Sequence, residues 1–175
     1  MTPDGPRVAH TPVLLRKGGR LGFHLARGNA LTRHLAAATS VLIVVNGPDG
    51  YVSPRWYSEA NQVPTWNYLT LECEGPVRPQ NREGLLDLLT ALSAHNEARI
   101  DGPPWTMDKV VPDALSRLAD AIVGFEMEVL TWRPTFKLSQ NKPKTEREAV
   151  IAGLEANGQT AIAALMRALV KDGDR

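Results

Sequence analysis

The sequence predicts an α+β fold: a mainly antiparallel β core, peripheral helices and a helical pair at the C-terminus. Apolar and polar residues alternate along several stretches, as in "VGFEMEV" at 123–129. The last thirty residues carry two helical patterns in a row. Strand and helix patterns do not alternate regularly along the chain, which argues against a doubly wound parallel sheet.

The composition is that of one globular domain. The chain has 175 residues, 43% of them hydrophobic, and a formal net charge of +1, so charge alone favours neither nucleic acid nor a membrane surface as a partner. No apolar run is long enough to span a bilayer and no signal-peptide pattern opens the chain, so we expect a cytoplasmic protein. The single cysteine, Cys73, excludes an internal disulfide, and its alternation with Leu69 and Leu71 predicts a buried thiol.

The first third of the chain is predicted to hold a hairpin, a helix and two strands. Gly18-Gly19 separates two apolar runs, as a hairpin turn does. Asn29 is a suitable N-cap for a helix that runs to about residue 38. "SVLIVVNG" predicts a buried strand that ends at Gly47-Pro48, and "GYVSP" predicts a short strand that Pro54 ends.

The middle of the chain is predicted to hold a long strand and two helices. The strand covers 63–77, with a bulge or bend at Gly75-Pro76. One helix begins after Asn81, which is a suitable cap, and the second begins near Pro112. The alternating strand at 123–129 follows.

The C-terminal part begins with an extended segment that runs to Pro143. Thr145 and Glu148 match the capping-box pattern for a helix, Gly158 ends that helix, and Thr160 caps the last one. We therefore expect an antiparallel β domain with inserted helices over 1–143, and a helical appendage over 144–175 packed on the same domain.

The stretch "GFHLARGNALTRHL" at 22–35 is the first candidate for a binding site. A helix N-terminus attracts anions, yet this one has Arg27 before it, Arg33 inside it and no acidic residue. A phosphate or carboxylate ligand explains the pattern. A pairing of Arg27 with a distant acid, with Asn29 as a simple cap, explains it equally well. His24, on the face opposite the apolar one, is a further candidate.

Two more stretches combine aromatic and amide side chains. In "SPRWYSEANQVPTWNY" the candidates are Ser53, Trp56, Thr65, Trp66 and Asn67. They form either an aromatic core cluster or a loop that faces a flat heteroaromatic ligand. In "FKLSQNK" the candidates are Lys137, Ser139, Gln140 and Asn141. Side-chain amides form hydrogen bonds with the polar edges of rings, so this segment is a candidate for ligand binding. The alternative is that it is simply the solvated end of a strand. No histidine pair has the spacing of a metal site, so we expect no metal.

The blocks "HLARGN", "GYVSPRWY", "VPTWNY", "VGFEMEV" and "KLSQNK" occur in this order across nearly the whole chain. They resemble the PaiB-like family, whose members are named FMN-binding negative transcriptional regulators. That family is similar to the FMN-binding split β-barrel of pyridoxamine-phosphate oxidases and flavin reductases. The resemblance implies a split barrel, FMN as the cofactor, and a homodimer with flavin at the subunit interface.

The resemblance also assigns the candidate residues to parts of FMN. It places the phosphate near Arg27 and Asn29, and the ring or ribityl chain near Ser53 and the run Thr65-Trp66-Asn67. Lys137 and the run Ser139-Gln140-Asn141 would complete the site. Family members usually carry a helix and a strand before the segment that matches "HTPVLL". We therefore expect a barrel edge that is either exposed or covered by another strand, and weaker FMN binding. Gly28 replaces a more usual alanine and should spare both phosphate anchors.

Three functions follow from the resemblance and the residues. The first is a negative transcriptional regulator that is redox-active or senses flavin. The second is a flavin-dependent oxidoreductase without a regulatory role. The third is a degenerate barrel that binds no flavin and acts as an oligomeric scaffold. The near-neutral charge gives direct DNA binding little support. The substrate and the electron donor stay open, and no catalytic residue is predicted.

Overall fold

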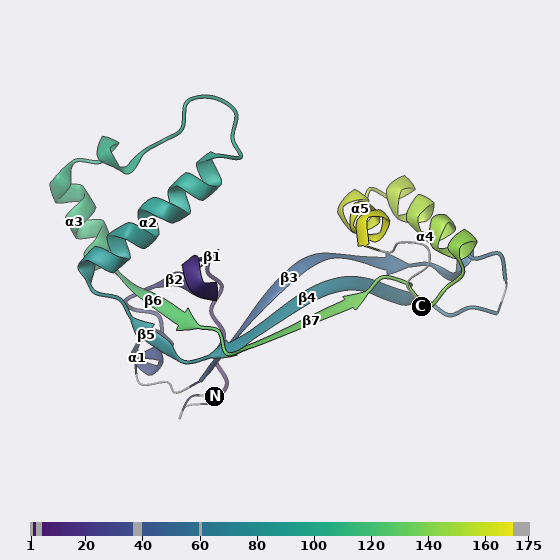
Figure 1. Cartoon of the computed structure of the whole chain (residues 1–175), viewed down its shortest axis with the longest axis horizontal. Coiled ribbons are helices and arrows are strands. Elements are labelled where there is room, and N and C mark those ends of the chain that lie inside the picture. Colours follow the sequence, from purple (N-terminus) through teal and green to yellow (C-terminus); the bar gives the residue numbers. More distant parts are fainter. Residues whose placement is uncertain (1, 3–4, 37–39, 60, 170–175) are drawn as a thin grey trace. The chain divides into compact units, whose positions relative to one another are not determined.

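The computed structural model describes residues 2, 5–36, 40–59 and 61–169. By their contacts the residues form two compact units, each built from two stretches of the chain. The first unit comprises Met1–Leu42 and Glu74–Thr131, and the second comprises Ile43–Cys73 and Trp132–Arg175. Figure 1 labels the elements. The predicted appendage at 144–175 belongs to the second unit, and the predicted division into two domains stays a prediction.

The first unit contains a four-stranded antiparallel sheet in the order β1-β2-β6-β5. The strands are β1 (Val13–Leu15), β2 (Arg20–Ala26), β5 (Val77–Pro79) and β6 (Ile122–Glu128). The predicted hairpin is confirmed, since β1 pairs with β2 and both glycines of the turn have positive φ. Phe23 lies opposite Phe125, and their stacked rings, with centroids 5.5 Å apart, form part of the core.

Two helices of the first unit, α2 (Arg82–Glu97) and α3 (Pro112–Asp120), contact strand β6. Both predicted starts are confirmed: the Asn81 side chain accepts a hydrogen bond from the Gly84 amide, and Pro112 is the first residue of α3. A Cβ atom at Gly22 would lie 2.7 Å from the Leu88 side chain of α2. Glycine therefore allows the helix to approach the sheet closely at this point.

The short helix α1 (Thr32–Leu35) differs from the prediction. It begins after Leu31, which makes no side-chain cap, so the assignment of Asn29 as N-cap is wrong. Asn29 instead accepts a hydrogen bond from the Leu31 amide, and this closes a turn before the helix. The predicted end of the helix falls on 37–38, outside the described residues.

The second sheet is three-stranded, in the order β3-β4-β7, and it is also antiparallel. Its strands are β3 (Val41–Val52), β4 (Thr65–Gly75) and β7 (Thr131–Lys137). The predicted strand end at Gly47-Pro48 is wrong, because β3 continues through both residues. An edge strand tolerates proline, which lacks an N–H group, and Gly47 lies so close to β4 that a Cβ atom would be 2.6 Å from the Leu69 side chain.

The last strand also ends earlier than predicted. β7 carries Pro134 and stops at Lys137, whereas the sequence predicted an extended segment up to Pro143. The chain turns at Ser139, which has a φ of 57°, and the Lys142 amide donates to the Ser139 carbonyl at 3.0 Å. The buried position predicted for Cys73 in β4 is confirmed.

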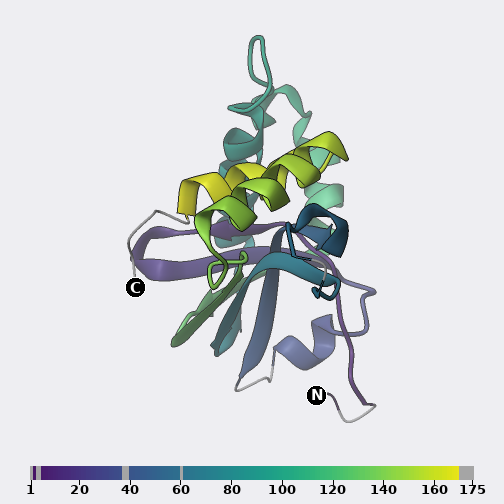
Figure 2. The same ribbon diagram turned by 90° about the vertical axis from the view of Figure 1, so that its right-hand side faces the viewer.

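Helices α4 (Lys144–Ala156) and α5 (Thr160–Leu169) pack side by side in the second unit, as Figure 2 shows. Their buried residues form one cluster with residues from β3 and the loops: Val52, Tyr57, Leu138, Val150, Ile151, Leu154, Ile162, Ala163 and Met166. The predicted capping box is wrong, because Pro143 occupies the N-cap position and Thr145 lies inside α4. Gly158, with a φ of 75°, follows α4 as predicted, and Thr160 is the first residue of α5.

Candidate functional site

Arg27 follows the end of strand β2 and is exposed. Its Nε donates to the Asp120 carbonyl at 2.8 Å, and one terminal nitrogen donates to the Ile122 carbonyl at 3.3 Å. These contacts occupy one edge of the guanidinium and hold the side chain against the C-terminal end of α3. The other edge carries further N–H donors, so it can bind one more anionic group.

His24 lies on β2 opposite Gly124 of β6, with its main-chain carbonyl accepting from the Thr11 hydroxyl at 2.6 Å. Its Nδ1 atom is buried and has no hydrogen-bond partner among the described residues. Burial lowers the pKa of His24. The imidazole is therefore favoured in its neutral form, which brings no positive charge to a phosphate.

Ser53 and Trp56 have structural contacts in the second unit. Ser53 is buried, and its hydroxyl accepts from the Arg55 amide at the start of the short 3-10 helix η2 (Pro54–Trp56). The Trp56 indole packs against α4 at Gly153, where a Cβ atom would lie 2.3 Å from the ring. Both residues therefore form part of the packing between this loop and the helical pair.

Asn67 and Ser139 form a buried pair. The Asn67 amide donates to Ser139 Oγ at 3.0 Å, the Ser139 hydroxyl donates to Asn67 Oδ1 at 3.2 Å, and the amide also reaches the Met166 sulfur at 3.4 Å. Both side chains are almost fully buried. Their polar groups are therefore used inside the protein.

Thr65 and Trp66 occupy the start of strand β4. The Thr65 hydroxyl accepts a hydrogen bond from Lys137 at 2.8 Å, which joins two of the predicted residues. The exposed Trp66 donates its indole N–H to Asp49 at 3.2 Å and meets the Tyr51 ring edge-on, with centroids 6.1 Å apart. Trp66 and Tyr51 thus expose aromatic surface on adjacent strands.

Tyr51 and Asp49 were not among the predicted residues. The predicted strand over 40–47 ended at Gly47-Pro48, whereas β3 continues to Val52 and includes both residues. An apolar run on both sides of that dipeptide was the available signal.

In the turn after β7, the polar side chains of Gln140 and Lys142 form hydrogen bonds with other residues of the chain. Gln140 accepts from the Leu138 amide and donates to the Phe136 carbonyl, both at 2.7 Å. Lys142 donates to Gln62 at 2.8 Å and lies over the Tyr57 ring. Asn141 is exposed. Gln140 is also exposed, but both ends of its amide group bind the main chain, so the segment stabilises the chain between β7 and α4.

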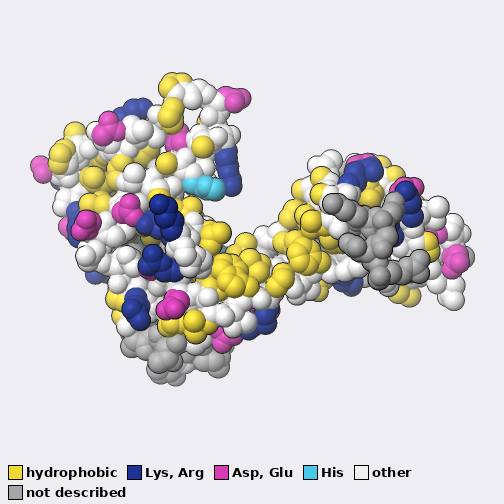
Figure 3. All heavy atoms as spheres, in the orientation of Figure 1, with side chains coloured by type: hydrophobic (Ala, Val, Ile, Leu, Met, Phe, Trp, Pro, Cys, Tyr) yellow, Lys and Arg dark blue, Asp and Glu magenta, His cyan; other side chains and the backbone are white. Residues whose placement is uncertain are grey.

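The three-stranded sheet exposes a large amount of apolar surface. Val44 and Val45 are consecutive in β3, and their side chains are 50% and 41% exposed. Because successive residues of a strand point to opposite faces, both faces of the sheet are uncovered here. Hydrophobic side chains gather over this sheet in Figure 3. Further exposed apolar residues on its strands are Leu42, Tyr51, Trp66, Trp132 and Phe136.

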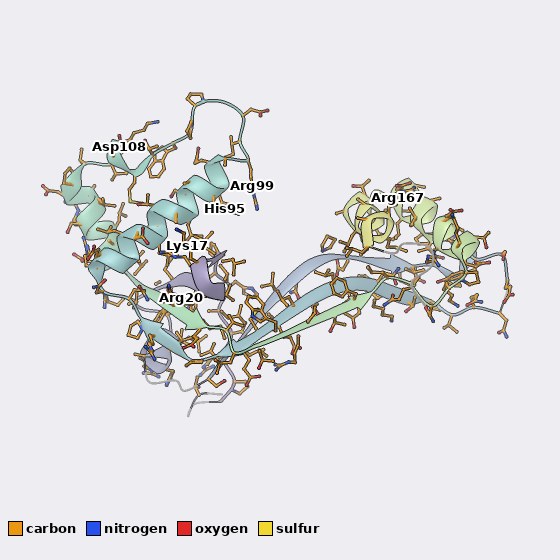
Figure 4. All side chains as sticks on the ribbon, viewed as in Figure 1. Lys17, Arg20, His95, Arg99, Asp108 and Arg167 are labelled. Atoms are coloured by element: carbon orange, nitrogen blue, oxygen red, sulfur yellow. The ribbon has the colours of Figure 1, made fainter. Side chains whose placement is uncertain are left out.

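Basic residues of the first unit are mostly engaged with nearby groups. Arg20 pairs with Glu126 at 2.7 Å, and Arg16 pairs with Asp87. Arg99, just beyond the end of α2, contacts the ring of His95 on the last turn of that helix at 2.9 Å (Figure 4). Arg82 likewise pairs with Asp120, and the formal net charge of the whole chain is +1. Among the described residues, no helix is long and apolar enough to cross a membrane.

These features define an α+β protein with two antiparallel sheets. The chain belongs to the family described as "Putative FMN-binding domain", which it matches over residues 1–131. It is 35% identical over 171 residues to the protease synthase and sporulation protein PAI 2 of Bacillus subtilis, across 95% of this chain and 81% of that protein. It is also 27% identical to an uncharacterized protein of Aspergillus fumigatus, across 89% of this chain and 74% of that protein. The predicted PaiB-like family and its flavin cofactor are thereby supported.

Two solved structures resemble the fold at low identity. The flavocytochrome Anf3 from Azotobacter vinelandii has a TM-score of 0.47 and 14% identity, over 78% of this chain and 58% of that one. An FAD- and heme-binding protein from Mycobacterium smegmatis has a TM-score of 0.46 and 17% identity, over 79% and 62%. The chain thus spans less than two thirds of either protein.

Proposed function

We propose that this chain is a PaiB-like FMN-binding protein that acts as a cytoplasmic homodimer with flavin at the subunit interface. The single observation that carries the proposal is the family match over residues 1–131. That range contains Arg27, the exposed residue with a free guanidinium edge, and Trp66, the exposed indole on β4.

Arg27 fits the phosphate group of FMN. Its free edge offers two parallel N–H donors, the arrangement that best matches phosphate oxygens. The main-chain turn at Asn29 lies close by in sequence, but α1 is a single turn and begins only at Thr32. The phosphate is therefore assigned to the arginine rather than to a helix end.

Within the second unit, the predicted residue Trp66 and its neighbour Tyr51, which was not predicted, are our candidates for contact with an aromatic ring. Both present exposed aromatic surface, and offset stacking or edge contacts with a flat ring are favourable. Asn67, Ser139 and Gln140 have their polar groups engaged within the chain. We assign these three to support of the site, and Lys137 and Asn141 to direct contact.

The uncovered sheet supports the homodimer. Exposed apolar surface on both faces of a sheet is costly in water, and a second copy would remove much of it. Bound flavin would supply any electron transfer, while the protein would bind and orient it. We propose a redox or flavin-sensing role in gene regulation that acts indirectly, because the net charge of +1 gives direct DNA binding little support.

An absorbance spectrum tests the proposal. The purified chain would be incubated with FMN, separated by gel filtration, and examined for flavin bands that elute with the protein at dimer mass. Co-elution supports the proposal, whereas a colourless protein after incubation with micromolar FMN would contradict it and favour the scaffold alternative.

Substitution of Arg27 tests the phosphate assignment. Arg27→Gln should weaken FMN binding by about 1.5–3 kcal/mol, the scale of a hydrogen bond to a charged group. Arg20→Gln is the matched control, since it removes an exposed arginine that pairs with Glu126 on the same sheet. Equal affinity of the two variants would contradict the assignment.

A further inference from the structure

The C-terminal end of helix α3 holds Arg27 from one side. Arg27 donates from its main-chain amide to the Ala121 carbonyl at 2.8 Å, and from its guanidinium to the carbonyls of Asp120 and Ile122. Carbonyls at a helix C-terminus carry partial negative charge and attract cations. The position of the guanidinium therefore depends on the position of this helix end.

A second arginine fixes the same helix end. Arg82, the first residue of α2, pairs with the Asp120 carboxylate. It also donates to the Ser116 carbonyl at 3.3 Å and to the Ser116 hydroxyl at 3.1 Å. One guanidinium thus bridges two residues of α3 that lie one helical turn apart.

Asp120 joins the two arginines through different atoms. Its carboxylate contacts Arg82 and its carbonyl accepts from Arg27 Nε. The two cations therefore do not compete for one acceptor. All of these residues belong to the first unit. The contacts orient Arg27 so that its Nε edge faces the protein and its other edge is free.

We propose that Arg82 is a positioning residue for a phosphate monoester bound by Arg27. It holds the end of α3 through Asp120 and Ser116, and the helix end in turn orients Arg27. This inference rests on the proposed function. A preoriented guanidinium loses less conformational entropy on binding than a free one, so it binds phosphate more tightly.

A double-mutant cycle tests the proposal, with FMN as the titrant and flavin fluorescence as the readout. The proteins are the unmodified chain, Arg82→Gln, Arg27→Gln and the double variant. We expect Arg82→Gln to weaken FMN binding about two- to fivefold, the scale of an exposed ion pair. In the Arg27→Gln background, Arg82→Gln should raise the dissociation constant for FMN by a smaller factor than it does in the unmodified chain. The reason is that no guanidinium is left at position 27 to orient.

Two further variants keep the test decisive. Asp120→Asn retains the carbonyl but removes the charge that Arg82 binds, so it should reproduce the effect of Arg82→Gln if the latter fails to fold. Arg20→Gln, which breaks an ion pair on the same sheet, should leave FMN affinity unchanged.

The outcomes separate the inference from the function on which it rests. An equal effect of Arg82→Gln in both backgrounds, or no effect in either, overturns the positioning role while FMN binding stands. A chain that binds no FMN, or whose affinity does not depend on Arg27, overturns the proposed phosphate site and the inference with it.

Discussion

Asn67 and Ser139 hold each other's side chains inside the second unit, although 72 positions separate them in the sequence. The pair has a second consequence for the backbone. Ser139 is the only residue other than glycine with positive φ among the described residues. Such a conformation is costly for a residue with a Cβ atom, and the buried hydrogen bonds to Asn67 offset that cost.

Substitutions at Ser139 should separate the hydrogen bonds from the backbone strain. Ser139→Ala removes the hydroxyl and leaves the Asn67 amide partly unsatisfied, so it should destabilise the protein by about 1–3 kcal/mol. Ser139→Gly loses the same hydroxyl but adopts positive φ freely, so it should be about 1–2 kcal/mol more stable than the alanine variant. Urea unfolding measures both. A glycine variant that is less stable than the alanine variant would refute the account of strain.

Gly153 should not tolerate alanine. Glycine to alanine within a helix normally stabilises by about 1 kcal/mol, but here the new Cβ atom would lie 2.3 Å from the Trp56 ring. We expect destabilisation of about 1–3 kcal/mol from overpacking, together with a shift in tryptophan emission. Gly28→Ala is the control, since no atom lies within 4 Å of its added Cβ. Equal stability of the two variants would show that Trp56 does not pack on Gly153.

His24 should make folding stability depend on pH. Burial lowers its pKa from the model-peptide value of 6.5, so the unfolded chain binds a proton more readily than the folded one. Its contribution to the free energy of unfolding is therefore complete above pH 6.5 and falls as the pH drops below 6.5 toward the folded-state pKa. Urea midpoints between pH 8 and pH 5 should decline less steeply for His24→Gln. Parallel curves for the two proteins would exclude this contribution.

Charge on the uncovered sheet should disrupt the proposed homodimer. Val45→Glu places a carboxylate among the exposed apolar residues of β3, and burying it in a dimer would be costly. We expect a shift from dimer to monomer in light scattering coupled to gel filtration. Val63→Glu is the matched control, because Val63 is 76% exposed but lies in the loop before β4. Dimers of equal stability in both variants would place the interface elsewhere.

The elements that were predicted correctly are those marked by residues within or next to the element itself. The hairpin depends on Gly18-Gly19, and the start of α2 depends on Asn81, whose side chain caps its own helix. The errors arose where distant contacts override local preference. Pro48 signals a strand end, yet pairing with β4 carries the strand through it.

The candidate site shows the same division. The sequence identified exposed residues such as Arg27 and Trp66, whose types suit phosphate and an aromatic ring. It could not show that Asn67 meets Ser139, since nothing near either residue predicts the other. It also could not show that the Arg27 guanidinium contacts α3, which lies about ninety positions further along the chain.

Both edge strands of the three-stranded sheet contain a proline, Pro48 in β3 and Pro134 in β7. A proline offers no N–H group to a strand that tries to join the edge. The prolines therefore hinder association through the edges of this sheet. Association of that kind can add strand after strand and lead to fibrils. Contact through the apolar faces, by contrast, adds no strand to the sheet. The chain can thus expose much apolar surface and still be protected against strand-by-strand growth at the edges of this sheet.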